Sequence, residues 1–109
     1  MGWRQTTLTI SSGAAESAEL SLVDNGVRRI KNITFINPAT LPETVVVKVA
    51  EATSGTYNTL NDGFGNDVTL LAGKSQVQAG ITAGALKLVS TSGNVAADRT
   101  FIIRGAAQK

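Results

Sequence analysis

Residues 61–67 contain a cluster of Asn and Asp side chains whose oxygen atoms are candidate ligands for a metal ion. The segment reads Asn-Asp-Gly-Phe-Gly-Asn-Asp, and hard cations such as Ca²⁺ prefer clustered oxygen ligands. A calcium loop of the EF-hand type closes with Glu at its twelfth position, which is Gly73 when counted from Asp62. Turn formation explains the same Asn, Asp and Gly residues. We therefore expect a turn here and no metal.

Enzyme chemistry has few candidate residues in this chain. It contains no histidine and no cysteine, which removes the commonest general base and Cys-based zinc sites. A Ser or Thr nucleophile would need Lys or a carboxylate as its base. We expect the glutamates to lie on solvent-exposed faces, where charge keeps a protein soluble: Glu16, Glu19, Glu43 and Glu51. The sequence thus predicts a protein that is not an enzyme and binds no cofactor.

Two groups of residues are candidates for binding a partner. Trp3 lies beside Arg4, and both residue types are enriched among those that dominate interfaces. Packing of Trp3 against its own domain is the alternative. Arg28, Arg29 and Lys31 form a small basic cluster within an expected strand. Protection of an exposed sheet edge explains such a cluster, and contact with a partner is the other interpretation.

Charge and hydropathy limit the partners further. Ten Lys and Arg residues against eight Asp and Glu give a net charge of +2, which does not make the basic stripe typical of nucleic-acid binding. No apolar run approaches the roughly 20 residues of a membrane span. We therefore expect neither nucleic acid nor a membrane as a partner.

The elements that position these residues are predicted to be strands. Residues 44–51 alternate, with Val45, Val47 and Val49 on one face and Val46 and Lys48 on the other, which is typical of a strand. β-Branched side chains suit a pleated, half-buried surface. We expect this segment to be a central strand of the domain.

Similar patterns predict eight or nine strands in total, separated by Gly, Asn and Pro turns. In residues 27–36, Ile30 is out of phase with Ile33 and Phe35, which predicts a β-bulge near Lys31 and Asn32. Residues 18–23 are expected to be a strand, with a helical turn as the alternative. The other expected strands are residues 6–11, 56–60, 67–70, 74–79, 85–91 and 99–104.

A single domain follows from the length of 109 residues. We expect an N-terminal arm at residues 1–5, a β-domain at residues 6–104, and a frayed C-terminal tail at residues 105–109. Many short strands without a convincing helix indicate a β-sandwich or a small barrel.

Residues 6–104 resemble the small jelly-roll head decoration (cement) proteins of tailed bacteriophages. The resemblance rests on the Leu-Thr-Ile-Ser-Ser-Gly opening at residues 8–13, on residues 33–38, and on Gly-Thr-Tyr at residues 55–57. Residues 60–69 supply Asp62, Gly65 and Val68, and Ala-Asp-Arg at residues 97–99 precedes the last strand. In one departure, residues 51–55 read Glu-Ala-Thr-Ser-Gly, where such proteins often have Ser-x-Asp-Gly.

The resemblance implies an all-β, jelly-roll-like β-sandwich of about eight strands that binds the outer surface of an assembled capsid. The implied partner is the major capsid protein lattice, and the implied assembly is a trimer at or near local threefold positions of the virion. Trp3, Arg4, Arg28, Arg29 and Lys31 are then the expected contacts. Two alternatives stay open. One is a tail, baseplate or head-fibre component, and the other is a carbohydrate-binding module that uses Tyr57 or Phe64.

Overall fold

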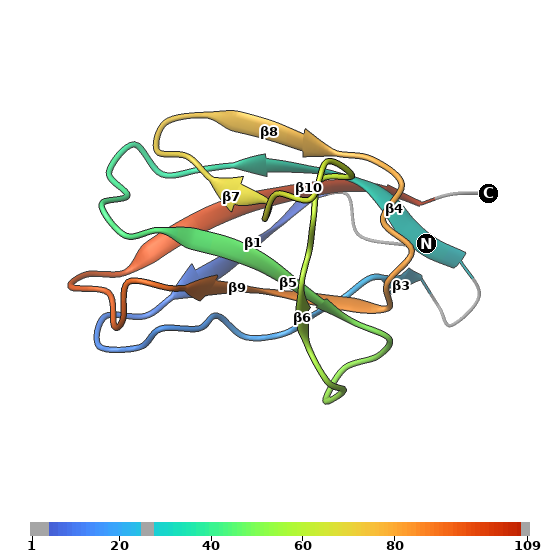
Figure 1. Cartoon of the computed structure of the whole chain (residues 1–109), viewed down its shortest axis with the longest axis horizontal. Coiled ribbons are helices and arrows are strands. Elements are labelled where there is room, and N and C mark those ends of the chain that lie inside the picture. The colour runs from blue at the N-terminus through green and yellow to red at the C-terminus, as the bar shows by residue number, and fades with distance from the viewer. Residues whose placement is uncertain (1–4, 25–27, 108–109) are drawn as a thin grey trace.

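Ten strands make up the regular structure of the chain in the computed structural model, which describes residues 5–24 and 28–107 (Figure 1). Those residues contain no helix, and so no helix that could cross a membrane. The strands are β1 (Gln5–Ile10), β2 (Leu20–Ser21), β3 (Val23–Asp24), β4 (Arg28–Ile36), β5 (Val45–Ala50), β6 (Asn58–Thr59), β7 (Thr69–Leu70), β8 (Ser75–Gln78), β9 (Ala85–Ser90) and β10 (Arg99–Ala107).

The strands form two antiparallel five-stranded sheets that pack face to face (Figure 1). The first sheet has the order β1-β10-β4-β3, and β8 also pairs with β4. The second has the order β2-β9-β5-β6, and β7 also pairs with β5. The predicted central position of residues 44–51 is confirmed, because β5 pairs with β9 on one side and with β6 and β7 on the other.

The order of pairing is that of a jelly roll. β1 pairs with β10, β2 with β9, β4 with β8, and β5 with β7, so the two halves of the chain pair like the arms of one long hairpin. Winding of this hairpin adds the pairs of β4 with β10 and of β5 with β9. The result is a sandwich in which the chain crosses repeatedly between the sheets, as expected.

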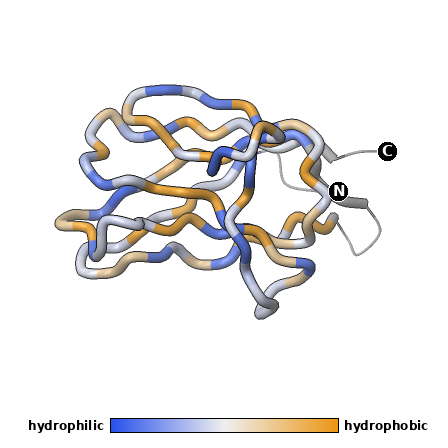
Figure 2. The backbone as a smooth tube through the Cα atoms, viewed as in Figure 1, coloured by the Kyte–Doolittle hydropathy of each residue, from blue (hydrophilic) through white to orange (hydrophobic). Residues whose placement is uncertain are grey.

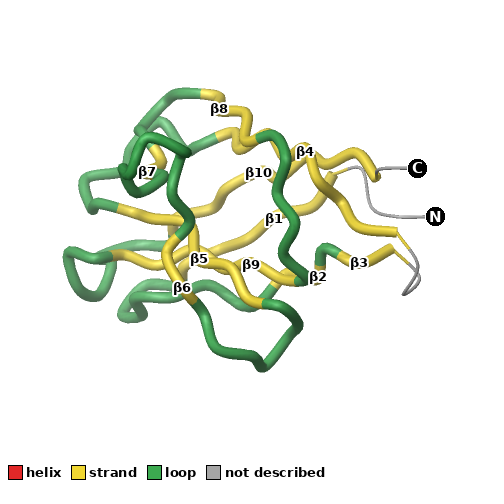
Figure 3. Tube along the Cα trace, turned by 45° about the vertical axis from the view of Figure 1, so that its right-hand side comes forward, coloured by secondary structure: helices red, strands yellow, loops and turns green. Residues whose placement is uncertain are grey.

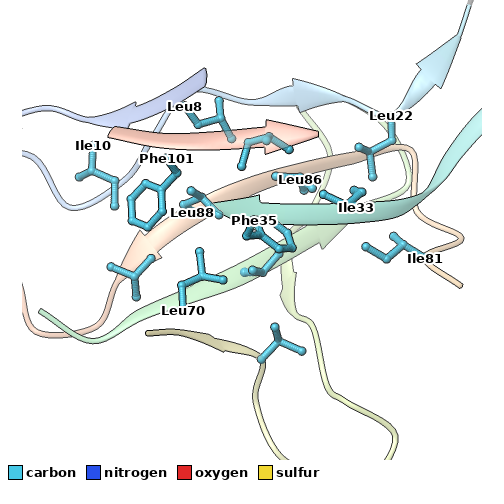
Figure 4. Packing of buried hydrophobic residues seen from close by; sticks show 14 of the residues in the cluster. Leu8, Ile10, Leu22, Ile33, Phe35, Leu70, Ile81, Leu86, Leu88 and Phe101 are labelled. Atoms are coloured by element: carbon cyan, nitrogen blue, oxygen red, sulfur yellow. The ribbon is translucent and has the colours of Figure 1, made fainter. Parts of the chain in front are cut away.

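The core between the sheets is filled from alternate positions of the long strands. Figure 2 shows the hydrophobic positions distributed along the strands, and Figure 4 shows their side chains meeting between the sheets. Phe35 and Phe101 have no exposed surface, and neither do Leu86 and Leu88, which lie on the same face of β9. Val46, on the other face of β5 from Val45 and Val47, is only 4% exposed.

Two details of the first sheet bear on the predictions. Ala106 pairs with Asn32 and Ala107 with Ile30, so Lys31 is the extra residue of a β-bulge, at the predicted place.

The same pairing shows that the predicted start of a frayed tail at residue 105 is wrong. β10 continues to Ala107, because β4 is long enough to pair with Gly105 and Ala106. The boundary of the N-terminal arm also shifts, because Gln5 pairs with Arg104 as the first residue of β1.

The strand predicted for residues 18–23 is divided in two. Leu20 and Ser21 pair with β9 in the second sheet, whereas Val23 and Asp24 pair with β4 in the first. Leu22, between them, is buried and donates its backbone N–H to the Gly84 carbonyl at 2.8 Å. The chain therefore crosses between the sheets at Leu22. The sequence Asp24-Asn25-Gly26 is typical of a tight turn, and its Asn25 and Gly26 lie outside the described residues.

Candidate functional site

A cleft of about 790 Å³ opens beside β6, between the end of β5 and segment 79–84, which leads from β8 to β9. Figure 3 shows this segment running from one sheet to the other. The apolar lining residues are buried or half-buried and form the floor: Val49, Leu60, Ile81 and Ala83. The polar lining residues are exposed and form the rim: Glu51, Thr56, Asn58 and Thr82. Such a site suits a ligand with one apolar group and one polar or cationic group.

One wall of the cleft depends on the close approach of Gly84 to β5. The Gly84 N–H donates to the Ala50 carbonyl at 2.9 Å. A Cβ atom at position 84 would overlap the carbonyl oxygen of Glu51 and lie 2.7 Å from its carbonyl carbon. Glycine is required here because only its missing side chain lets the two backbones pack at this distance.

Glu19 fixes the turn of residues 52–55, which borders the cleft at Ala52. Its Oε2 accepts a hydrogen bond from the backbone N–H of Ser54 at 2.5 Å and another from the Tyr57 hydroxyl at 2.9 Å. Ser54 has φ of 64°, a left-handed conformation that costs a non-glycine residue about 1–3 kcal/mol. Glu19 is thus more than a solvent-face charge, since it stabilises a strained turn through both contacts.

Two lysines oppose each other on the second sheet, next to this turn. Lys48 of β5 pairs directly with Lys87 of β9, and like charges at paired positions repel. Glu16 offsets the repulsion through an ion pair with Lys87 at 2.8 Å, and this hydrogen bond holds the pKa of Glu16 below its usual value. The Lys87 Nζ also lies 4.6 Å from the centre of the Tyr57 ring, a cation–π contact.

The hydroxyl of Tyr57 predicts a pH dependence of stability. Burial, and then the hydrogen bond to Glu19, raise its pKa to about 12, against about 10 in an unfolded chain. The contribution of this hydroxyl to the free energy of unfolding is fully present below about pH 10, and it is lost as the pH rises toward about 12. Tyr57→Phe removes the ionisation and keeps the ring over Lys87. Urea denaturation between these pH values should show a steeper loss of stability in the wild type than in the variant. Parallel pH profiles would contradict this assignment.

The loop of residues 61–67 forms a turn, as the sequence predicts. The Asp62 Oδ1 accepts hydrogen bonds from the backbone N–H groups of Phe64 at 2.8 Å and Asn66 at 3.3 Å. The bond from Phe64 is the main reason that the pKa of Asp62 is lowered. Within residues 5–24 and 28–107, no group of three or more His, Cys, Asp or Glu side chains is placed to hold a metal ion. The carboxylate of Asp62 therefore has a structural role.

Glu43 is not a solvent-face residue, and this prediction is wrong. Its carboxylate accepts two hydrogen bonds from Arg99, from Nε at 2.9 Å and from Nη2 at 3.1 Å, and both side chains are only 10% exposed. These hydrogen bonds lower the pKa of Glu43. The ion pair joins the segment before β5 to the first residue of β10. These two parts of the chain are 56 positions apart in the sequence.

The structure describes the backbone of three of the predicted partner-binding residues, and none of these three is among the residues that line the cleft. Trp3 and Arg4 lie outside the described residues. Arg28 and Arg29 pair with Asp24 and Val23 of β3, and Lys31 is the bulged residue of β4. β4 also pairs with β10 and β8 and so is not an edge strand. Arg28 and Arg29 themselves pair only with β3, because the described pairs of β4 with β10 begin at Ile30 and those with β8 at Ile33, so edge protection and contact with a partner both stay predictions.

Sequence reasoning missed the cleft and its supports. Glu19 and Ser54 are 35 positions apart, and no local pattern indicates their hydrogen bond. It also missed the exposure of two large apolar side chains, Leu71 at 53% and Val77 at 68%, whereas Phe64, the candidate for binding a sugar, is 90% exposed. Phe64 and Leu71 lie between β6 and β8, and Val77 lies within β8.

Comparison with known proteins supports the fold. No family model and no curated protein matches this chain. Among solved structures, it is similar to one described as an IMPa metallopeptidase in complex with T-antigen, with a TM-score of 0.54 and 18% identical residues. The match covers 95% of this chain but only 12% of the metallopeptidase chain. At this level of identity the likeness shows a shared fold and nothing of the activity.

Proposed function

We propose that this chain is a non-enzymatic structural protein of a bacteriophage virion that decorates and stabilises the outer surface of the capsid. The observation that supports the proposal is the jelly-roll connectivity of the two sheets. It is the fold of the head decoration proteins that residues 6–104 resemble. The apolar core between the two sheets also supports a preformed surface, which loses little conformational entropy on binding.

Decoration stabilises a capsid by linkage. A protein that binds only the expanded lattice lowers the free energy of that state by mass action. A trimer that contacts several capsid subunits at once gains effective concentration, so that weak single contacts suffice. The proposed contacts are the arm with Trp3 and Arg4, and the basic cluster of Arg28, Arg29 and Lys31.

Co-sedimentation of the purified protein with expanded and unexpanded shells tests this function. We expect saturable binding to expanded shells and at least tenfold weaker binding to unexpanded ones, a difference of about 1.4 kcal/mol. Equal recovery in the pellet with and without shells would contradict the proposal.

The basic cluster is tested in the same assay. Arg28→Ala/Arg29→Ala should weaken shell binding at low salt and reduce its salt dependence, because charges at an interface act through screened attraction. Lys74→Ala/Arg104→Ala removes the same charge from two other exposed positions and is the matched control. Equal effects of the two pairs would exclude the cluster as a specific contact.

A carbohydrate-binding module is the second candidate, favoured by the exposure of Phe64. Its side chain is 90% exposed, and an exposed ring can stack on a sugar face. The Tyr57 ring is less suitable, because Lys87 lies against it and Glu19 accepts a hydrogen bond from its hydroxyl. A glycan-array signal that Phe64→Ala abolishes would favour this function. Assembly of the pure protein into rings or tubes without shells would instead favour a tail, baseplate or head-fibre component.

A further inference from the structure

The cleft beside β6 is built as a binding site, yet the described chain leaves its rim charge unpaired. Glu51 is exposed and forms no ion pair with another residue of the described ranges. Below it, the floor offers half-buried apolar surface from Val49, Leu60 and Ala83. A ligand that places an apolar group on the floor and a cation beside Glu51 would match both features.

The walls of the cleft are held in place without a ligand. Glu19 fixes the turn of residues 52–55 through Ser54 and Tyr57. Gly84 holds segment 79–84 against the end of β5 through its hydrogen bond to Ala50. Binding to such a preformed site costs little conformational entropy.

We propose that the cleft binds the N-terminal residues 1–4 of a second copy of this chain, with Trp3 on the floor and Arg4 beside Glu51. This segment contains the only Trp of the chain, directly followed by a cation. Trp and Arg are the residue types that most often dominate the binding energy of an interface. The volume of about 790 Å³ lies within the range of about 300–1,000 Å³ that pockets use for compact ligands.

The width of the first sheet favours an occupant from another copy. Gln5 lies in one row of the first sheet with Arg104, Thr34 and Val77, in that order. Three strand spacings of about 4.8 Å place Gln5 about 14 Å from Val77. Gly80 is the first lining residue of the cleft after β8, and its N–H donates to the Asn32 Oδ1 at 3.4 Å. Trp3 precedes Gln5 by two residues, which span at most about 7 Å.

The geometry also sets the kind of assembly. β1 is the edge strand on the opposite side of the first sheet from β8, and the cleft lies at the β6 and β8 side. Binding of one copy's arm in the next copy's cleft is a heterologous contact, which closes into a ring when the rotation allows it. This inference goes beyond decoration and assigns Trp3 and Arg4 to contacts between copies, which leaves the basic cluster of Arg28, Arg29 and Lys31 as the proposed contact with the capsid.

A charge exchange tests the pairing of Arg4 with Glu51. Arg4→Glu and Glu51→Lys should each weaken self-association about tenfold at low salt, because each places like charges together. The double variant should restore it, since the opposite charges then meet again. Asp67→Lys makes the same charge change at another exposed carboxylate and should have no effect. The measurement is light scattering over a concentration series, read against the monomer mass of 11.3 kDa.

Trp3→Ala tests the apolar half of the site and should weaken self-association about thirtyfold or more, the effect of losing a dominant interface residue. Phe64→Ala is the matched control, because it removes an exposed aromatic side chain that does not line the cleft. Circular dichroism identifies any variant that fails to fold. For such a variant, the light-scattering measurement is replaced by a binding measurement, in which a peptide of residues 1–5 is added to a protein that lacks residues 1–4. A monomeric wild type at all concentrations, or failure of the double variant to recover while folded, would overturn the inference.

Discussion

Gly84→Ala is expected to lower the free energy of unfolding by about 3–5 kcal/mol, the sum of overpacking and of weakened buried hydrogen bonds. The added Cβ would overlap the carbonyl oxygen of Glu51, a backbone atom that cannot move away by rotating a side chain. Relief of the overlap requires separation of segment 79–84 from β5. This separation weakens two hydrogen bonds of Gly84, one to Ala50 and one from Leu22.

The measurement is urea denaturation of the variant beside Gly93→Ala. Gly93 has φ of 94°, and a Cβ there meets no atom within 4 Å. The control therefore costs only the strain of a left-handed alanine, about 1–2 kcal/mol. A loss for Gly84→Ala no larger than that of the control would show that the close approach is not required. Because Gly84 also holds a wall of the cleft, the folded fraction of the variant should not self-associate.

Phe35→Ala is expected to destabilise the protein by about 3–5 kcal/mol, because it leaves a cavity between the sheets. The ring of Phe35 has no exposed surface, and Figure 4 shows it among the side chains of both sheets. A domain of this size has a total stability of about 5–15 kcal/mol. The variant should therefore be close to unfolding at room temperature.

Phe64→Ala removes the same side chain from a position where it is 90% exposed, and it should change stability by no more than about 0.5 kcal/mol. Thermal or urea denaturation of both variants gives the comparison. Similar losses for the two would mean that Phe35 does not pack in the core as described. A large loss for Phe64→Ala alone would assign the exposed ring a structural contact.

The sequence predicts most of the strands because their signals are local. The alternation of Val45, Val47 and Val49 is sufficient to identify β5. The phase error at Ile30 predicts the bulge at Lys31 because side-chain direction alternates strictly in an unbroken strand. The Asn, Asp and Gly residues of the loop at 61–67 predict its turn, which Asp62 stabilises from within the loop.

The errors arise where a partner distant in sequence decides the structure. Gly105 and Ala106 have little strand propensity and join β10 only because β4 offers them a ladder. Residues 18–23 alternate like one strand, yet their ends pair with different sheets. Glu43 resembles a surface charge until Arg99, 56 positions away, is placed beside it. The cleft could not be predicted, because its walls come from segments that only the fold brings together.

Imaging of expanded shells after incubation with excess protein tests the central claim of capsid decoration most directly. The account predicts additional density on the outer surface at or near the local threefold positions, with the dimensions of a jelly-roll oligomer, and none on unexpanded shells. Folded protein that leaves the outer surface of expanded shells bare at saturating concentration would contradict the claim.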